Sequence, residues 1–296
     1  MHVMVDGRKE LGYEFRRWYD WIFSPLLGML SPALRPYVTI DPAAEEVVKH
    51  RTTHYALDLL YLSGETIPAE SLMERLARSF WFNTQNARGV RNRLRLVTFL
   101  LDQELSRLLS LHTEEPCRLL SIASGSARAV LDATERTLKR LPEGSVHITL
   151  LDKELAALSY SRKIAEQKGL TGNTRVSLSW VQGTAESFVR SQNAHQNRLH
   201  LIEMVGLLDY FQDKKAISLF EAIYQALNPD GAFITANIVP NWEQKFVSRF
   251  VEWPMVYRTH DQLASLLLDA GFSSQDLTFI YEPLKTHVVA VARKPK

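Results

Sequence analysis

The sequence predicts an α/β protein: a seven-stranded, mainly parallel sheet with an antiparallel last strand, preceded by a helical N-terminal segment. From about residue 118 onward, short apolar runs alternate with helical patterns, as in successive βαβ units. At the end of the chain, two β-rich runs lie only about five residues apart, which is too close for a crossover helix. Before residue 113, apolar side chains recur at helical spacing instead.

The alternating region supplies five strands that right-handed crossovers must join, because parallel neighbours in one sheet are connected that way. The last two strands, Leu277–Tyr281 and His287–Ala292, must be antiparallel neighbours. An ordinary nicotinamide-binding sheet lacks this ending. The earlier strands are expected at Arg118–Ala123, Val146–Leu151, Arg175–Val181, Arg198–Met204 and Gly231–Ile238, and the helices at Ala127–Lys139, Leu155–Lys168, Ala185–Ser191, Lys214–Leu227 and His260–Ala270.

The helical segment begins with an aromatic-rich stripe from Tyr13 to Ile22, which Ser24-Pro25 ends. Further helices fit Pro42–Leu62, Ala69–Ser79 and Asn86–Leu111. We expect residues 1–112 to form a helical cap that helps to hold the substrate, and residues 113–296 to form the ligand-binding domain. A basic cluster on the last of these helices is expected to face solvent; it comprises Arg88, Arg91, Arg93 and Arg95.

Composition excludes several classes of protein. The net charge of +2 is too small to indicate a nucleic-acid partner. The single cysteine, Cys117, excludes an intrachain disulfide and a cysteine-only metal site. Charged residues near the start argue against a signal peptide, and no apolar run approaches the ~20 residues that span a bilayer, so we expect a cytoplasmic protein.

A metal site is a weaker alternative. Glu46, His50 and His54 recur at four-residue spacing and would share one helical face. Two histidines at this spacing can bind zinc, but Arg51 stands where zinc protease motifs have a glutamate. We therefore expect no metal.

The stretch from Leu119 to Arg128 has the character of a ligand-binding turn: an apolar strand, a run of very small residues and the start of a helix. Small residues let a ligand approach the backbone closely, and free N–H groups at a helix N-terminus bind polar groups. The candidate residues in this turn are Ala123, Ser124, Gly125 and Ser126.

Three further strand ends should meet this turn, because ligands of open α/β sheets bind outside the carboxyl ends of the strands. Asp152 follows the second strand, where its carboxylate could accept both ribose hydroxyls of an adenosine ligand or cap the next helix. Gly183 and Thr184 would lie beside an adenine ring, and Glu203 lies at the end of the fourth strand. The remaining candidates are Lys153, Ala185 and Met204.

The order of these elements resembles the class I S-adenosylmethionine-dependent methyltransferase family, with its Rossmann-like sheet, over roughly residues 115–293. The features that carry the resemblance are the first loop around Gly125, the acid Asp152, the turn 228–231 (Asn-Pro-Asp-Gly) and the segment 270–272 (Ala-Gly-Phe). More narrowly, residues 121–128, 206–210 and 253–258 resemble bacterial methyltransferases of 3-hydroxy fatty acid methyl ester formation. The resemblance implies S-adenosyl-L-methionine as the cofactor.

The chain departs from the family pattern at four positions. Ser121 stands where the first strand usually has an acid, and Ala123 and Ala127 replace the outer glycines of the loop. Thr184 stands where an aspartate is common. Alanine still permits a close approach to the backbone where φ is negative.

Methyl transfer from a sulfonium is an in-line displacement, so the enzyme mainly aligns the reacting atoms and excludes water. A carboxylate acceptor would need no general base, whereas a phenol or an amine could use Glu203, Tyr257 or His260. Glu203 could instead only bind the cofactor, and His260 could simply occupy the first turn of a helix that Thr259 caps. Arg258 could clamp an acidic substrate or have a structural role.

The resulting hypothesis is methyl transfer to a small-molecule or lipid-like acceptor, by O-, N- or carboxyl-methylation. The alternatives are another transfer from the same cofactor, such as aminopropyl transfer, and a non-catalytic module of the same fold. The N-terminal segment could be a lid, a part of the core, a homodimer face or a membrane-contact element. As a lid, with a loop at residues 80–83, it would turn some of these side chains toward the cofactor pocket: Tyr13, Trp18, Phe80, Trp81, Asn83 and Asn86.

Overall fold

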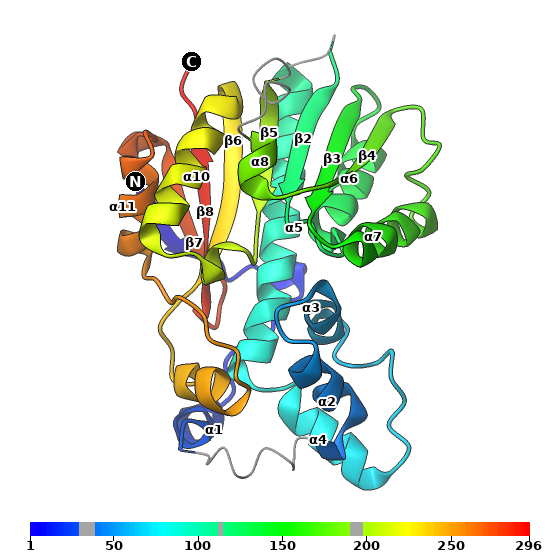
Figure 1. The fold of residues 1–296 in the computed structure, drawn as a ribbon, viewed down its shortest axis with the longest axis vertical. Helices are drawn as coiled ribbons and strands as arrows, with labels where there is room; N and C mark the ends of the chain where they lie inside the picture. The colour runs from blue at the N-terminus through cyan, green and yellow to red at the C-terminus, as the bar shows by residue number, and fades with distance from the viewer. Residues whose placement is uncertain (30–38, 112–114, 190–197) are drawn as a thin grey trace.

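One mixed sheet forms the centre of the molecule in the computed structural model, which describes residues 1–29, 39–111, 115–189 and 198–296 (Figure 1). The strand order is β1-β7-β8-β6-β5-β2-β3-β4. Neighbouring strands are parallel except where β8 pairs with β6 and with β7. The strands are β1 (His2–Val5), β2 (Cys117–Ile122), β3 (Val146–Asp152), β4 (Val176–Gln182), β5 (Leu199–Met204), β6 (Leu227–Ile238), β7 (Leu277–Tyr281) and β8 (His287–Arg293).

The antiparallel ending that the sequence predicts is confirmed. Strand β8 lies between β6 and β7, so that Ala292 pairs with Phe233 on one side and with Leu277 on the other. The short connection from β7 to β8 is organised by Glu282, whose carboxylate accepts hydrogen bonds from the backbone N–H groups of Leu284 (2.7 Å) and Thr286 (2.5 Å). The fold is therefore the Rossmann-like α/β class expected from the alternation of strands and helices.

Strand β1 was missed by the sequence analysis. It extends the sheet beyond β7 in parallel, with His2 paired to Thr278. All four of its residues are exposed, so the strand has no buried face and produces no alternating apolar pattern. The segment before residue 113 thus contributes an edge strand as well as helices. The boundary proposed at residues 112 and 113 lies outside the described residues.

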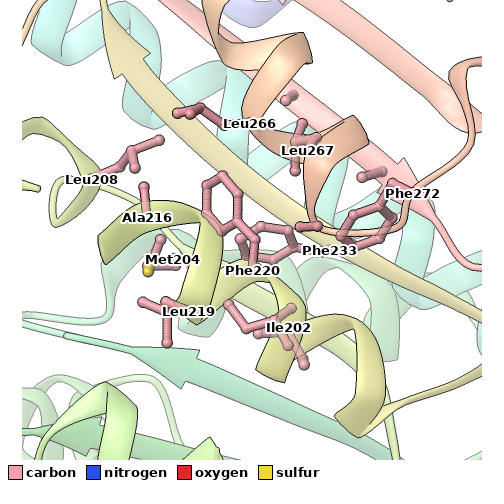
Figure 2. Close-up of a cluster of buried hydrophobic side chains, with 14 of the residues drawn as sticks. Ile202, Met204, Leu208, Ala216, Leu219, Phe220, Phe233, Leu266, Leu267 and Phe272 are labelled. Carbon is pink, nitrogen blue, oxygen red and sulfur yellow. The ribbon is translucent and has the colours of Figure 1, made fainter. Parts of the chain in front are cut away.

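Helices cover both faces of the sheet and bury two large apolar clusters. On one face, α8, α10 and α11 pack against β5, β6, β7 and β8; Figure 2 shows Phe220 of α10 lying against Phe233 of β6. On the other face, α5, α6 and α7 pack against β2, β3 and β8. The helices here are α6 (Arg128–Arg140), α7 (Leu155–Gln167), α8 (Ala185–Val189), α10 (Asp213–Ala226) and α11 (His260–Asp269); residues 190 and 191 of the predicted third helix are outside the described ranges.

The longest helix, α5 (Gln85–Leu111), joins the sheet to the N-terminal helices (Figure 1). Its C-terminal half packs against α6 and the sheet through buried leucines such as Leu101 and Leu105. Its first turn is capped by the buried Glu243, whose carboxylate accepts hydrogen bonds from the backbone N–H groups of Gln85 (2.9 Å) and Asn86 (2.8 Å). The cap comes from residues far away in the sequence, which fixes the segment after β6 to the start of α5.

Four shorter helices form a cap at the carboxyl ends of the strands: α1 (Asp20–Leu27), α2 (Pro42–Lys49), α3 (His54–Tyr61) and α4 (Leu72–Trp81). The prediction of one helix over Pro42–Leu62 is wrong, because Thr52 adopts a left-handed φ of 74° and Thr53 caps a new helix. His50 and His54 therefore lie on different helices. Within the described ranges, no helix combines the length and the apolar character of a bilayer-spanning segment.

Other boundaries in the cap also differ from the prediction. The aromatic stripe becomes helical only at Asp20, and Pro25 lies inside α1 instead of ending it. Phe80 and Trp81 form the last turn of α4, not a loop. The last turn of α4 is fixed by contacts with a distant segment, since Trp81 stacks on Phe246 and Phe250.

The expectation that the basic cluster of α5 faces solvent is wrong for three of its four arginines. The side chains of Arg88, Arg91 and Arg93 are 0%, 7% and 3% exposed. Arg88 pairs with Asp20 at 2.5 Å, and Arg91 pairs with Glu14 at 2.6 Å. The acidic partners of Arg88 and Arg91 come from the segment before α5 in the chain, so the sequence of the helix alone could not reveal them. These pairs fasten residues 14–20 to α5.

Removing the carboxylate of Asp20 should therefore destabilise the protein strongly. In Asp20→Ala, Arg88 would remain buried without its counter-charge, which typically costs about 3–5 kcal/mol. Urea unfolding monitored by circular dichroism measures this difference. The matched control is Glu46→Ala, which removes the exposed partner of Lys49 and should cost less than about 1 kcal/mol. Equal effects of the two substitutions would contradict the role of the buried pair.

Candidate cofactor and acceptor site

The turn between β2 and α6 is curled so that its backbone groups line a cavity. Ala123, Gly125 and Ala127 all have positive φ, between 52° and 53°. This corrects the expectation that the two alanines would have negative φ. An L-residue in the left-handed region is strained, and such strain is typical of functional sites. The turn also holds the buried Ser124 hydroxyl, which has no hydrogen-bond partner.

The helical cap closes over this turn. His54 of α3 lies against Gly125, where an added Cβ would come within 3.3 Å of the His54 Cβ atom. Asp58 of α3 pairs with Arg128 at the start of α6 (2.8 Å from Nη2) and accepts a hydrogen bond from Tyr160 (2.6 Å). Burial lowers the pKa of His54, so the imidazole favours its neutral form. The cavity beneath the turn is thus walled by the cap and by the sheet.

Asp152 lies at the end of β3 and organises the neighbouring backbone. One carboxylate oxygen accepts a hydrogen bond from the N–H of Gly125 (2.9 Å), and the other accepts one from the N–H of Glu154 (2.9 Å). Glu154, not Asp152, is the N-cap residue of α7. A carboxylate has about four acceptor positions, so each oxygen retains capacity for a ligand hydroxyl.

Glu203 lies at the end of β5 and is buried beside β2. Its carboxylate accepts a hydrogen bond from the Ser121 hydroxyl at 2.6 Å. Burial raises the pKa of the Glu203 carboxyl from 4.5 to about 7, although the hydrogen bond from Ser121 lowers it in part. Both Glu203 and the turn line the same cavity.

The other predicted cofactor residues lie around this edge in different ways. The Met204 side chain packs into the core beneath α10 (Figure 2), so only its backbone faces the strand end. Lys153 is exposed and pairs loosely with Glu154. The N–H of Gly183 donates to the Asp152 carbonyl (3.0 Å), and Thr184 accepts a hydrogen bond from the N–H of Ser187 at the start of α8. Ser126 is buried in the turn, and Ala185 begins α8.

A second, larger cavity lies between the cap helices and the segment that follows β6. It encloses about 930 Å³ when the open space at its mouth is included. Its walls are mainly apolar and aromatic and include Trp81, Phe246, Phe250, Trp253 and Met255. Leu57 and Arg93 line both cavities, which places the two side by side.

None of the six residues that a lid was expected to turn toward the cofactor pocket lines the cavity beneath the turn, but two of them line the larger cavity instead. They are Trp81 and Asn86. Tyr13 is buried in the sheet core, and Trp18 and Phe80 are 79% and 42% exposed. Asn83 donates to the Ser79 carbonyl at the end of α4.

The remaining catalytic candidates, Arg258, Tyr257 and His260, differ in their hydrogen-bond partners. Arg258 is buried and gives its N–H groups to Asp213, Asn237 and the carbonyl oxygens of Leu208 and Phe211, which favours a structural role. Burial raises the pKa of Tyr257, whose hydroxyl has no hydrogen-bond partner. His260 occupies the first turn of α11, after the capping box of Thr259 and Gln262, and contacts the Tyr281 hydroxyl.

The sequence analysis missed the arginine that lines both cavities. Arg93 was grouped with solvent-facing arginines, although Val90, Arg93, Leu94 and Val97 share one helical face. Three apolar neighbours at this spacing were the available signal that Arg93 points inward. Among the described residues, no group of three or more His, Cys, Asp or Glu side chains is arranged to hold a metal ion.

Comparisons with known proteins agree with this geometry. A family model described as "Putative methyltransferase" (Methyltransf_20) matches residues 54–294. The structure is similar to a possible exported protein from Bordetella parapertussis, with a TM-score of 0.64, 20% identity and coverage of 88% of this chain and 85% of that chain. It is also similar to magnesium protoporphyrin IX methyltransferase from Synechocystis PCC 6803, solved with bound SAH, with a TM-score of 0.50, 8% identity and coverage of 69% and 86%. No curated protein sequence matched the chain.

A mixed sheet with an antiparallel last strand and a ligand-sized opening at its carboxyl edge defines the class I S-adenosylmethionine-dependent methyltransferases. Because the family model spans most of its length, the chain belongs to the family Methyltransf_20 and is a methyltransferase of this class.

Relieving the strain in the turn between β2 and α6, hereafter the first turn, should stabilise the protein. Glycine adopts positive φ without the Cβ clash, so Ala127→Gly should raise the free energy of unfolding by about 0.5–1 kcal/mol. Urea unfolding is the measurement. Ala222→Gly, within α10, is the matched control and should lower stability by about 0.5–1 kcal/mol. A loss of stability in Ala127→Gly would show that the turn does not have the described conformation.

The raised pKa of Glu203 predicts a pH dependence of stability. Its contribution is fully present below about pH 4.5 and is lost as the pH rises through about 7, because the folded protein holds this proton more tightly than the unfolded chain. Glu203→Gln stays neutral and should flatten the decline between about pH 5 and about pH 8 by up to about 3 kcal/mol. Urea midpoints measured across this range test the difference. Parallel profiles for the two proteins would refute the shift.

Proposed function

We propose that this protein transfers the methyl group of S-adenosylmethionine to an apolar small molecule, lipid-like or aromatic, held in the larger cavity. The observation that carries the proposal is the position of that cavity: its walls are mainly apolar, and it adjoins the cavity beneath the turn between β2 and α6. When bound, the cofactor supplies an electrophilic methyl group. The protein then has to hold the acceptor in line and to exclude water.

The cavity beneath the first turn has the groups that the cofactor requires. Ser124 offers a buried hydroxyl that lacks a partner. Asp152 retains acceptor capacity for ribose hydroxyls, and Glu203 is positioned for the amino group. Gly183, Thr184 and Ala185 would lie beside the adenine. Of the residues assigned to this site, Ala123, Ser124, Gly125, Ser126 and Glu203 line the cavity. Asp152 adjoins it through its hydrogen bond with Gly125, whereas residues 153, 183–185 and 204 do not line it.

Glu203 is also suited to accept a proton from a phenol or an amine. A general base works best when its pKa lies near the operating pH, and burial raises that of Glu203 to about 7. Tyr257 is not suited to this role, because its raised pKa keeps the phenol protonated and it lines neither cavity. Arg258 and His260 are already bonded within the protein. A carboxylate acceptor is already deprotonated and needs no general base, so Glu203 would then only bind the cofactor.

Residues 1–112 serve in this proposal as a cap that forms the acceptor cavity, and residues 113–296 as the cofactor-binding domain. Helices α2, α3, α4 and the start of α5 contribute the cap side of the cavity. The exposed stripe on and before α1, which includes Trp18 and Trp21, lies outside this cavity.

Asp152 provides the first test of the cofactor site. If its carboxylate accepts the ribose hydroxyls, Asp152→Ala should weaken binding of S-adenosylhomocysteine by about 1.5–3 kcal/mol, the range for a hydrogen bond to a charged group. Isothermal titration calorimetry measures the affinity. The exposed neighbour Glu154 supplies the control, Glu154→Ala, which should bind as the wild type does. Unchanged affinity in Asp152→Ala with a lowered melting temperature would mean that Asp152 only organises the backbone.

Filling the larger cavity provides the test of the acceptor site. Val251→Trp adds bulk to the cavity wall and should abolish transfer of labelled methyl groups to a panel of acids, phenols and amines while leaving S-adenosylhomocysteine binding unchanged. Val176→Trp, at a half-buried valine of β4 remote from the cavity, is the control and should retain transfer. If Val251→Trp keeps full activity, the acceptor binds elsewhere.

A further inference from the structure

We propose that Arg93 is a carboxylate-binding residue at the junction of the two cavities. This inference rests on the proposed function, because it assigns a ligand group to the same site. The ligand chemistry is a carboxylate, which could belong to the amino-acid end of the cofactor or to the acceptor.

The first argument is that Arg93 is buried with an unused donor. Its side chain is 3% exposed, and its Nε atom has no hydrogen-bond partner. A buried polar group without a partner costs about 1–3 kcal/mol, and more when it is charged. Arg88 and Arg91, on the same helix, each have an Nε bond to a protein acceptor. The free Nε of Arg93 is therefore an exception that a bound ligand would explain.

The second argument is that the nearby carboxylates do not neutralise Arg93 closely. Asp209 approaches its guanidinium only to 3.6 Å, and the other side-chain partner is the uncharged Tyr61 hydroxyl, so the donor left over is Nε. The other Asp209 oxygen is held by Asn237 (3.0 Å) and by the N–H of Ile238 (2.9 Å). Glu203 is the next acid, and its raised pKa leaves it partly protonated near neutral pH. Arg93 thus retains positive charge and donor capacity for a further anion.

The third argument is position. Arg93 lines both the cavity beneath the first turn and the larger apolar cavity. Gly206, at the end of β5, lies beside it: an added Cβ there would be 3.8 Å from the Arg93 guanidinium. The walls of the larger cavity are mainly apolar, so one guanidinium where the two cavities meet suits a molecule with an apolar body and an anionic head. The planar fork of arginine matches a carboxylate with two hydrogen bonds.

A second unpartnered group faces the same space. The Ser124 hydroxyl is buried and unbonded in the turn that lines the cavity shared with Arg93. Four buried side-chain N or O atoms lack partners among the described residues, and these two both belong to this cavity wall. Such a concentration at one place indicates a polar ligand.

The variant Arg93→Lys tests the proposal. It keeps a positive charge opposite Asp209 but loses the fork and the Nε donor. The matched control is Arg95→Lys, two residues along the same helix, where the partly exposed side chain pairs with Glu14 outside both cavities. Thermal unfolding of each variant establishes that it is folded.

Calorimetry with two pairs of probes separates the two sources of the carboxylate. The first pair is S-adenosylhomocysteine and 5′-methylthioadenosine, which lacks the amino-acid end. The second pair is dodecanoate and dodecan-1-ol, titrated in the presence of saturating S-adenosylhomocysteine. We expect Arg93→Lys to lose affinity at least about tenfold for one carboxylate probe and to leave its uncharged or truncated partner unchanged.

Each outcome is decisive. A selective loss with S-adenosylhomocysteine assigns Arg93 to the cofactor, and a selective loss with dodecanoate assigns it to the acceptor. If Arg93→Lys binds all four probes as Arg95→Lys does, Arg93 is not a carboxylate site. Failure of the proposed function appears separately, as absence of binding of both nucleoside probes to the wild-type protein.

Discussion

The structure depends on ion pairs between the buried arginines of α5 and carboxylates from other segments of the chain. A buried arginine is tolerated only when an acceptor meets it, because an uncompensated charge is far more costly than a lost surface contact. Arg88 and Arg91 meet this condition by pairing with Asp20 and Glu14. The segment before the cap helices is thereby fixed to a helix whose other half packs on the sheet. The same helix consequently positions both the cap and the catalytic edge.

This arrangement explains how two cavities come to share a wall. Leucines anchor the C-terminal part of α5 against α6 and the sheet. The Glu243 carboxylate anchors the N-terminal end of α5. The part between these anchors crosses the carboxyl ends of the strands. Arg93 lies on that part, between the smaller cavity under the turn that joins β2 to α6 and the larger apolar cavity in the cap.

The first turn shows how the chain accommodates its departures from the family pattern. Ser121 replaces an acid, and its hydroxyl donates to Glu203, where a second carboxylate would have repelled the first. Ala123 and Ala127 replace glycines but keep the left-handed conformation that glycine adopts freely. The conformation is maintained by surrounding contacts, including the hydrogen bond from Gly125 to Asp152. Local strain is thus stored at the candidate site.

The sequence by itself determined the α/β fold, the antiparallel last strand and the segments that meet at the carboxyl edge. Those features follow from local periodicity and from connection lengths, which a single chain displays directly. The tertiary structure decided which acidic residues meet the buried arginines. Arg88 and Arg91 resemble surface residues until Asp20 and Glu14, distant in sequence, are brought to them, whereas the burial of Arg93 had a local signal in the apolar neighbours on its helical face. Strand β1 and the break at Thr52 were also decided at that level, because pairing at a sheet edge and packing between helices leave no periodic signal in the residues themselves.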